Sequence, residues 1–170
     1  TLSSWLIDQC DDLQLDFRPH LDLSLVNGES YSQFFIRLMH SWYGDKGLVV
    51  LDASHPDLKA LFAPAIAREL SGQGIAPSIK PGKVTPREIN LFYSPPGEDR
   101  VGIINIEDGL KAGSKILNTS STPWNEWVLN NAQALSPSVL LRPYYQEHLL
   151  ANSHVILGPG EFAYWEQLPF

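Results

Sequence analysis

Two segments near the end of the chain place a charged residue beside a helix-starting proline. Arg142-Pro143 follows the apolar run 139–141, and Gly158-Pro159-Gly160-Glu161 follows the apolar run 155–157. Proline suits the first turn of a helix because its missing N–H would have no partner there. Each segment therefore predicts a short buried strand that turns directly into a helix, with an arginine or a glutamate close to the turn.

Two consecutive strand-to-helix turns predict an α/β fold in which helices flank a parallel sheet. In such sheets, ligands bind at the carboxyl ends of the strands, close to helix N-termini. Arg142 would stand at that edge, and a guanidinium group can hold a carboxylate or a phosphate through two hydrogen bonds. The glycines at 158 and 160 would let the backbone approach the same anion. The pattern predicts an anion-binding site.

Each of these residues also has a purely structural interpretation. The two glycines can serve only a tight turn, with Glu161 stabilising the N-terminus of the next helix. Arg142 can form a salt bridge, to Glu147 or to Glu161. Asp52, which ends the apolar run 47–51, can bind a ligand hydroxyl, although capping of the following turn is the favoured interpretation. Core packing is likewise favoured over base stacking for Tyr164.

Other catalytic chemistries have little support in the sequence. His148 and His154 lack carboxylates at metal-ligand spacing, so no metal site is predicted. The chain has neither the Gly-x-Ser-x-Gly motif of hydrolases nor the three-glycine motif of dinucleotide-binding folds. Its single cysteine, Cys10, lies beside two aspartates, and this negative charge disfavours the reactive thiolate. Cys10 is therefore a poor candidate nucleophile.

Composition narrows the class of protein and its partners. The chain has 170 residues, of which 44% are hydrophobic and 18% charged, so we expect one folded domain with a real core. The net charge of -7 argues against nucleic acid or an anionic membrane as a partner and leaves a small molecule. Apolar runs are far shorter than the ~20 residues that span a bilayer. A single cysteine fits a reducing compartment, and we expect a cytoplasmic protein.

The termini and the element pattern suggest part of a longer protein. The chain starts at Thr1 without a methionine or a signal peptide and stops soon after a predicted helix. We therefore expect residues 1–170 to be a single fragment of an α/β core. Within it, 75–118 reads as an inserted hairpin region, because 87–93 and 100–106 predict two antiparallel strands around a Pro-Pro-Gly loop. Three residues apart on the first strand, Arg87 and Asn90 would face opposite sides.

Helical periodicity is clear in three further segments. Apolar residues at three- and four-residue spacing predict a helix over 30–43 that ends at Gly44. Pro56 begins a second helix, whose core face is predicted to contain Leu58, Leu61, Phe62 and Ile66. A third helix begins at Pro123, with Trp124, Trp127, Val128 and Leu135 on its buried side.

The C-terminal segment resembles the bacillithiol-biosynthesis cysteine-adding enzyme family. Its matching residues are Arg142, Pro143, Gln146, Glu147, Gly158, Pro159, Gly160, Glu161, Ala163, Tyr164 and Trp165. A second segment, Arg87-x-x-Asn90-Leu91-Phe92, is similar to a strand of the same family. The resemblance extends, more loosely, over most of the chain.

The resemblance implies a Rossmann-like core related to nucleotidyltransferases, in a ligase that attaches cysteine to the amine of glucosaminyl-malate. It implies binding of substrate or nucleotide by Arg142, Gly158, Pro159, Gly160, Gln146, Tyr164, Asp52 and Asn90. Glu161 or Glu147 would take the amine proton. It leaves open whether a nucleotide such as ATP or ADP takes part, and it implies a homodimer for the full-length protein.

The family's Gly-rich, His-bearing motif and its coiled coil are absent from these 170 residues. We therefore expect the isolated chain to be an inactive part of the ligase. The alternative is a non-catalytic domain with the same core, which binds a small molecule or an anion or serves in assembly. The presence of those two flanking elements in the full gene product would favour the ligase.

Overall fold

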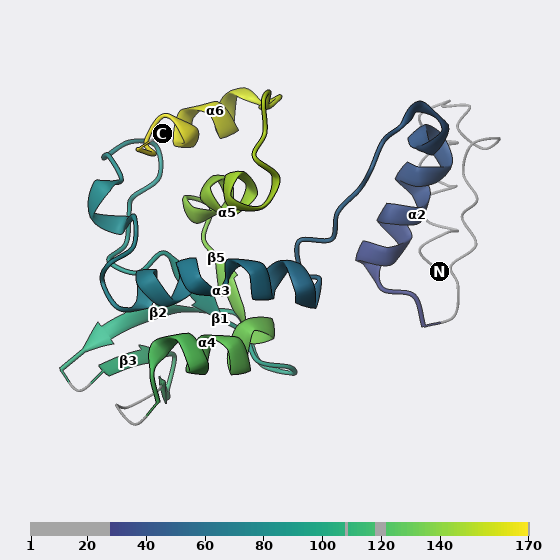
Figure 1. Cartoon of the computed structure of the whole chain (residues 1–170). Helices are drawn as coiled ribbons and strands as arrows, with labels where there is room; N and C mark the ends of the chain where they lie inside the picture. Colours follow the sequence, from purple (N-terminus) through teal and green to yellow (C-terminus); the bar gives the residue numbers. More distant parts are fainter. Residues whose placement is uncertain (1–27, 108, 118–121, 170) are drawn as a thin grey trace, which may run out of the picture. The chain divides into compact units, whose positions relative to one another are not determined.

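The computed structural model describes residues 28–107, 109–117 and 122–169 (Figure 1). The chain divides into two compact units, residues 1–53 and 54–170. In the first unit, helix α2 (Tyr31–Tyr43) continues into a 3-10 turn, η2 (Gly44–Lys46). Ser30 caps α2, because its Oγ accepts from the backbone N of Gln33, whose Oε1 accepts from the N of Ser30. The helix predicted over 30–43 is confirmed. Cys10 lies outside the described residues.

The second unit contains a five-stranded antiparallel sheet of order β4-β3-β2-β1-β5. Its strands are β1 (Leu91–Tyr93), β2 (Val101–Ile106), β3 (Gly109–Ala112), β4 (Lys115–Leu117) and β5 (Leu135–Pro137). The predicted hairpin is confirmed: β1 pairs with β2 in antiparallel register, with Phe92 opposite Gly102. The first strand is shorter than predicted, since it begins at Leu91.

Four helices belong to this unit: α3 (Pro56–Leu70), α4 (Trp124–Asn131), α5 (Leu141–Leu150) and α6 (Pro159–Trp165). Two 3-10 turns, η3 (Ala76–Ser78) and η4 (Ala132–Ala134), join the larger elements. The start of α3 was predictable because Pro56 is its first residue and the His55 ring accepts from the backbone N of Asp57 at 3.3 Å. Among the described residues, no helix is long and apolar enough to cross a membrane.

The core lies between one face of the sheet and the helices α3, α4 and α5 (Figure 1). Its fully buried members include Phe62, Ile66, Leu91, Ile103, Leu117, Val128, Leu135 and Leu141. Leu61, predicted on the core face of α3, is instead 62% exposed. A smaller cluster of Ile79, Leu140 and Leu168 packs with Tyr164 of α6.

The predicted parallel sheet is wrong for the described part of the chain, whose strands all pair antiparallel. The runs 49–51 and 155–157 form no strand, and their side chains include Val49 at 75% exposure and Ile156 at 100%. A strand needs a neighbour for its backbone N–H and C=O groups, and no described strand pairs with either run. The run 139–141 leads into α5, where Leu140 and Leu141 are buried against two different clusters. Short apolar runs satisfy the pattern of a buried strand without specifying one.

Candidate anion-binding site

Three arginines line one pocket of about 270 Å³ in the second unit. We call it the arginine pocket; its lining residues are Val84, Thr85, Arg87, Asn90, Phe92, Arg100, Ser138, Val139, Leu140 and Arg142. None of the described residues that line it is acidic, although the chain as a whole carries a net charge of -7. Positive charge is therefore concentrated in a hollow of an acidic protein.

A hydrogen-bond network around Asn90 shapes one wall of the arginine pocket. The side chain of Asn90 accepts from the backbone N of Arg87 at 3.1 Å and donates to the carbonyl of the same residue at 2.8 Å. The backbone N and Nδ2 of Asn90 also donate to Oε1 of Glu69, at 3.1 and 3.4 Å. The segment 87–90 is consequently a bend rather than a strand. The prediction that Arg87 and Asn90 face opposite sides is wrong, since both line the pocket.

The β1–β2 hairpin carries Arg100 to the same pocket. Its guanidinium group donates from Nε to Oγ of Ser136 and from Nη2 to the carbonyl of Pro137, each at 3.0 Å. The guanidinium carbons of Arg100 and Arg87 lie 3.8 and 5.2 Å from the centroid of the Phe92 ring. Two of the three cations are thus held over one aromatic side chain.

Arg142 reaches the pocket from the first turn of α5, whose start is fixed by a bond from its backbone N to the carbonyl of Ser138. Among the described residues, Arg142 forms no ion pair, so neither Glu147 nor Glu161 neutralises it. Burial lowers the pKa of Arg100, and the charge of Arg142 lowers it further. This repulsion between like charges would be relieved by a bound carboxylate or phosphate.

The structure keeps the glycine turn apart from the arginine pocket. Glu161 caps α6: its Oε2 accepts from the backbone N of Gly158 at 3.0 Å, and its Oε1 accepts from the hydroxyl of Tyr164 at 3.4 Å. Gly158, Pro159 and Gly160 are exposed and do not line the pocket. The predicted meeting of this turn with Arg142 at one parallel-sheet edge is therefore wrong, because that sheet is not formed.

The remaining predicted residues lie elsewhere. Gln146 and Glu147 are half-buried on α5, where Glu147 accepts from Nδ2 of Asn152 at 2.9 Å. Asp52 lies in the first unit, in a segment without regular secondary structure. The structure thus gathers Arg142 and Asn90 in one pocket, and leaves Gln146, Glu147, Asp52 and Tyr164 outside its lining.

Tyr164 lies outside the pocket lining, but the charge of Arg142 affects its pKa. Its pKa is raised by burial, by the charge of Glu161 and by their hydrogen bond, while the charge of Arg142 lowers it. We expect Glu161→Gln to lower the pKa of Tyr164 and Arg142→Ala to raise it, as followed by NMR of ¹³C-labelled tyrosine. Because the folded pKa is raised, the stability that Tyr164 contributes is present below the ordinary tyrosine value near pH ~10 and is lost as pH rises. Shifts of the same sign in both variants would contradict this arrangement.

The pocket residues missing from the sequence-based set are Arg87, Arg100, Phe92 and Ser138. The predicted hairpin carried a usable signal, because Arg87 and Arg100 are the first residues of its two predicted strands. The sequence does not predict that α5 packs beside that hairpin, and this packing brings Arg142 to the same pocket.

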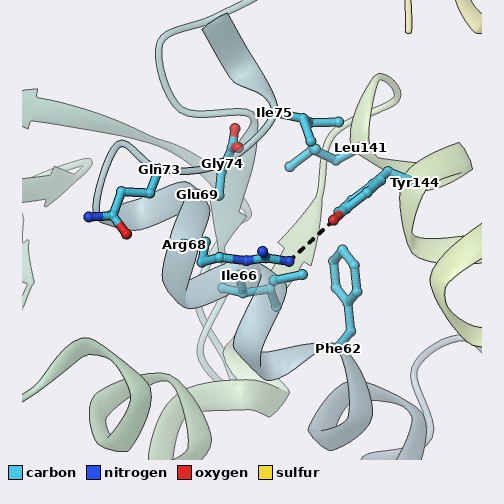
Figure 2. Close-up of a pocket in the computed structure, with 10 residues that line it drawn as sticks. Phe62, Ile66, Arg68, Glu69, Gln73, Gly74, Ile75, Leu141 and Tyr144 are labelled. Atoms are coloured by element: carbon cyan, nitrogen blue, oxygen red, sulfur yellow. Dashed lines mark hydrogen bonds between the residues drawn. The ribbon is translucent and has the colours of Figure 1, made fainter. Parts of the chain in front are cut away.

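A second pocket, of about 80 Å³, lies between α3 and α5 and includes Glu69 in its lining (Figure 2). Phe62, Ile66, Ile75 and Leu141 give it apolar walls. Across it, Nη2 of Arg68 donates to the hydroxyl of Tyr144 at 3.5 Å. Its small volume and apolar walls make it a weaker candidate for a substrate than the arginine pocket.

The fold and the pocket define an α/β domain with a candidate anion site, since three guanidinium groups and, among the described residues, no carboxylate line the pocket. The chain belongs to the family described as bacillithiol biosynthesis BshC, N-terminal Rossmann-like domain, which matches residues 11–169. This agrees with the mixed α/β architecture and confirms the resemblance seen in the sequence.

Several curated relatives carry the name "Putative cysteine ligase BshC". Those from Flavobacterium psychrophilum and Flavobacterium johnsoniae are 39% and 37% identical, each over 77% of this chain and 26% of the relative. The relative from Geobacillus thermodenitrificans is 31% identical over 92% of the chain and 32% of its own length. The chain therefore spans about a quarter to a third of the relatives that it matches.

Proposed function

We propose that this chain forms a substrate-binding part of a cytoplasmic ligase that adds cysteine to the amine of glucosaminyl-malate in bacillithiol biosynthesis. Family membership supports the reaction class, and the observation that carries the proposal is the arginine pocket. A ligase that joins a carboxyl group to an amine must hold anionic groups in place. Arg87, Arg100 and Arg142 provide positive charge for this, and Asn90 provides a fixed polar wall.

The pocket chemistry suits a carboxylate and the phosphates of a nucleotide equally well, since guanidinium groups bind both through paired hydrogen bonds. ATP or ADP is therefore a proposed second ligand of the complete protein. We retain Glu161 and Glu147 as proposed proton acceptors for the amine. Both carboxylates already accept hydrogen bonds, and each keeps further lone pairs that could take a proton. We also propose that the complete protein is a homodimer.

A non-catalytic anion-binding domain is the second candidate function. It is favoured by the fact that the arginine pocket is lined entirely by residues 84–142 of one unit. Such a pocket can bind an anion whether or not the rest of a ligase is present.

The two functions can be separated with the complete protein that contains this domain. Incubated with cysteine, glucosaminyl-malate and ATP, it should yield a product heavier by one cysteine residue, detected by mass spectrometry. The double variant Arg87→Ala, Arg142→Ala should lose most of this product, because both cations line the pocket. Arg68→Ala removes an exposed arginine outside the pocket and should keep it. Anion binding without any cysteine addition would favour the non-catalytic domain.

A further inference from the structure

Glu69 of α3 carries a buried carboxylate, and among the described residues only one of its two oxygens has a hydrogen-bond partner. The residue is 3% exposed, and its Oε1 accepts from the backbone N and Nδ2 of Asn90. Its Oε2 is buried and has no hydrogen-bond partner among the described residues. Buried carboxylates are normally paired, and each exception calls for a missing donor such as a water or an ion.

The nearest basic neighbour in sequence does not supply that donor. Arg68 extends toward Tyr144, to which it donates a hydrogen bond (Figure 2). Neither Arg68 nor another described cation forms an ion pair with Glu69. The carboxylate of Glu69 therefore lacks a cationic partner among the described residues.

The backbone at Gly74 packs closely against Oε2. A Cβ added to Gly74 would lie 2.1 Å from this oxygen, so any larger residue would collide with the carboxylate. Gly74 is not among the glycines with positive φ, so its backbone conformation does not require glycine. Close approach to Glu69 is the constraint that explains the residue.

Glu69 and Gly74 also line a pocket of about 170 Å³, which we call the acidic pocket. Glu88 and Asn105 add two exposed polar groups to it, and Leu70, Pro77 and Ile89 add apolar surface. Within the described part of the chain, no lysine or arginine lines it. It is distinct from the arginine pocket, with which it shares no lining residue.

We propose that the acidic pocket binds a small primary ammonium group. An ammonium presents three N–H donors, which match the free Oε2 of Glu69, the carboxylate of Glu88 and the side-chain oxygen of Asn105. The apolar walls suit a short aliphatic chain, and the volume exceeds the ~30 Å³ share of one liquid water severalfold.

A metal ion fits the acidic pocket less well than an ammonium. Ca²⁺ takes about six to eight oxygen ligands, whereas the side chains lining this pocket include two carboxylates. Within the described residues, no group of three or more His, Cys, Asp or Glu side chains could hold a metal. This proposal does not depend on the proposed ligase function, because it concerns a separate pocket.

The test is a titration of the ¹⁵N-labelled 170-residue chain with ethylammonium chloride at constant ionic strength. We expect saturable NMR shifts at the amide of Gly74 and the side-chain amides of Asn90 and Asn105. Tetramethylammonium has the same charge but no N–H donor, and it should cause no saturable shift. Equal responses to the two cations, or shifts that never saturate, would overturn the proposal and leave an ordered water as the partner of Oε2.

Two variants sharpen the test. Glu88→Gln removes an exposed charge and should weaken ethylammonium binding about fivefold without disturbing the fold. Glu69→Gln should weaken it at least about tenfold, the scale of a charge-assisted hydrogen bond. Glu126→Gln, on the exposed face of α4, removes the same charge outside the pocket and should bind as the parent does. Unchanged affinity in Glu88→Gln would refute the site even if Glu69→Gln failed to fold.

Discussion

Replacing Phe62 with alanine is expected to lower the free energy of unfolding of the second unit by about 3–5 kcal/mol. Phe62 is 2% exposed and lies at the centre of an aromatic group. Its ring centroid is 4.5 Å from that of Tyr145, 5.6 Å from His148 and 6.0 Å from Tyr144. Alanine would leave a cavity and bury less apolar area. It would also remove these ring contacts, which stabilise the fold beyond the area that they bury.

The neighbouring residue provides the control. Leu61 is 62% exposed, so Leu61→Ala should change the free energy of unfolding by about 0.5 kcal/mol or less. Urea denaturation followed through the methyl resonances of Ile66 and Ile103, both buried in this unit, measures the two variants on the same core. Similar losses in both would mean that α3 is rotated from the orientation described here.

This pair of residues also shows what helical periodicity alone can predict. The spacing of Leu58, Leu61, Phe62 and Ile66 indicates one apolar stripe, which is why the sequence predicts all four in the core. The apolar stripe is wider than the part of α3 that α4, α5 and the sheet cover. Leu61 belongs to the stripe but lies outside the covered part. Periodicity gives the direction of a helix face, whereas its edge depends on the neighbours that pack against it.

Local signals were the reliable ones. Ser30, Pro56 and Pro123 lie at or next to the starts of α2, α3 and α4, because caps and N-terminal prolines act within one helical turn. The hairpin was also predictable, since the Pro-Pro-Gly loop within 94–100 joins two strands that pair with each other. These features need no knowledge of distant residues.

Predicting the sheet requires knowledge of which distant segments pair, and the predicted parallel sheet was therefore wrong. Residues 139–141 are apolar because Leu140 and Leu141 enter two clusters from the start of α5, not because they form a strand. The strand that precedes α5 is β5, Leu135–Pro137, which contains a serine and a proline and pairs antiparallel with β1. An edge strand tolerates proline, so its sequence gave little sign of its role.

The candidate site was predictable only in part for the same reason. Arg142 was predicted from its place at the start of a helix and Asn90 from the family motif, and the structure places both in the arginine pocket. Arg87 and Arg100 lie near them because β1 pairs with β2 and β5 pairs with β1. A cluster of like charges from three separate segments cannot be seen in residue spacing.

Replacing Arg142 with alanine is expected to weaken the binding of a small polyanion to the arginine pocket by about 1.5–3 kcal/mol, or roughly ten- to a hundredfold. Arg142 has no ion-pair partner among the described residues, so its guanidinium group can bind an anion without breaking an existing pair. Arg142 is exposed, and solvent screening places the expected loss near the lower limit of this range. Calorimetry with citrate as the probe measures it directly on the 170-residue chain.

Arg68→Ala is the matched control, because it removes the same charge from an exposed arginine that lines the small pocket instead. It should leave citrate affinity within about twofold, the scale of a distant surface charge screened by salt. If both variants weakened citrate equally, the protein's overall charge would be responsible and the arginine pocket would not be the binding site. If neither did, Arg142 would be a surface residue of α5. Arg142→Lys adds a geometric test, since lysine restores the charge but not the paired donors, and it should recover only part of the lost affinity.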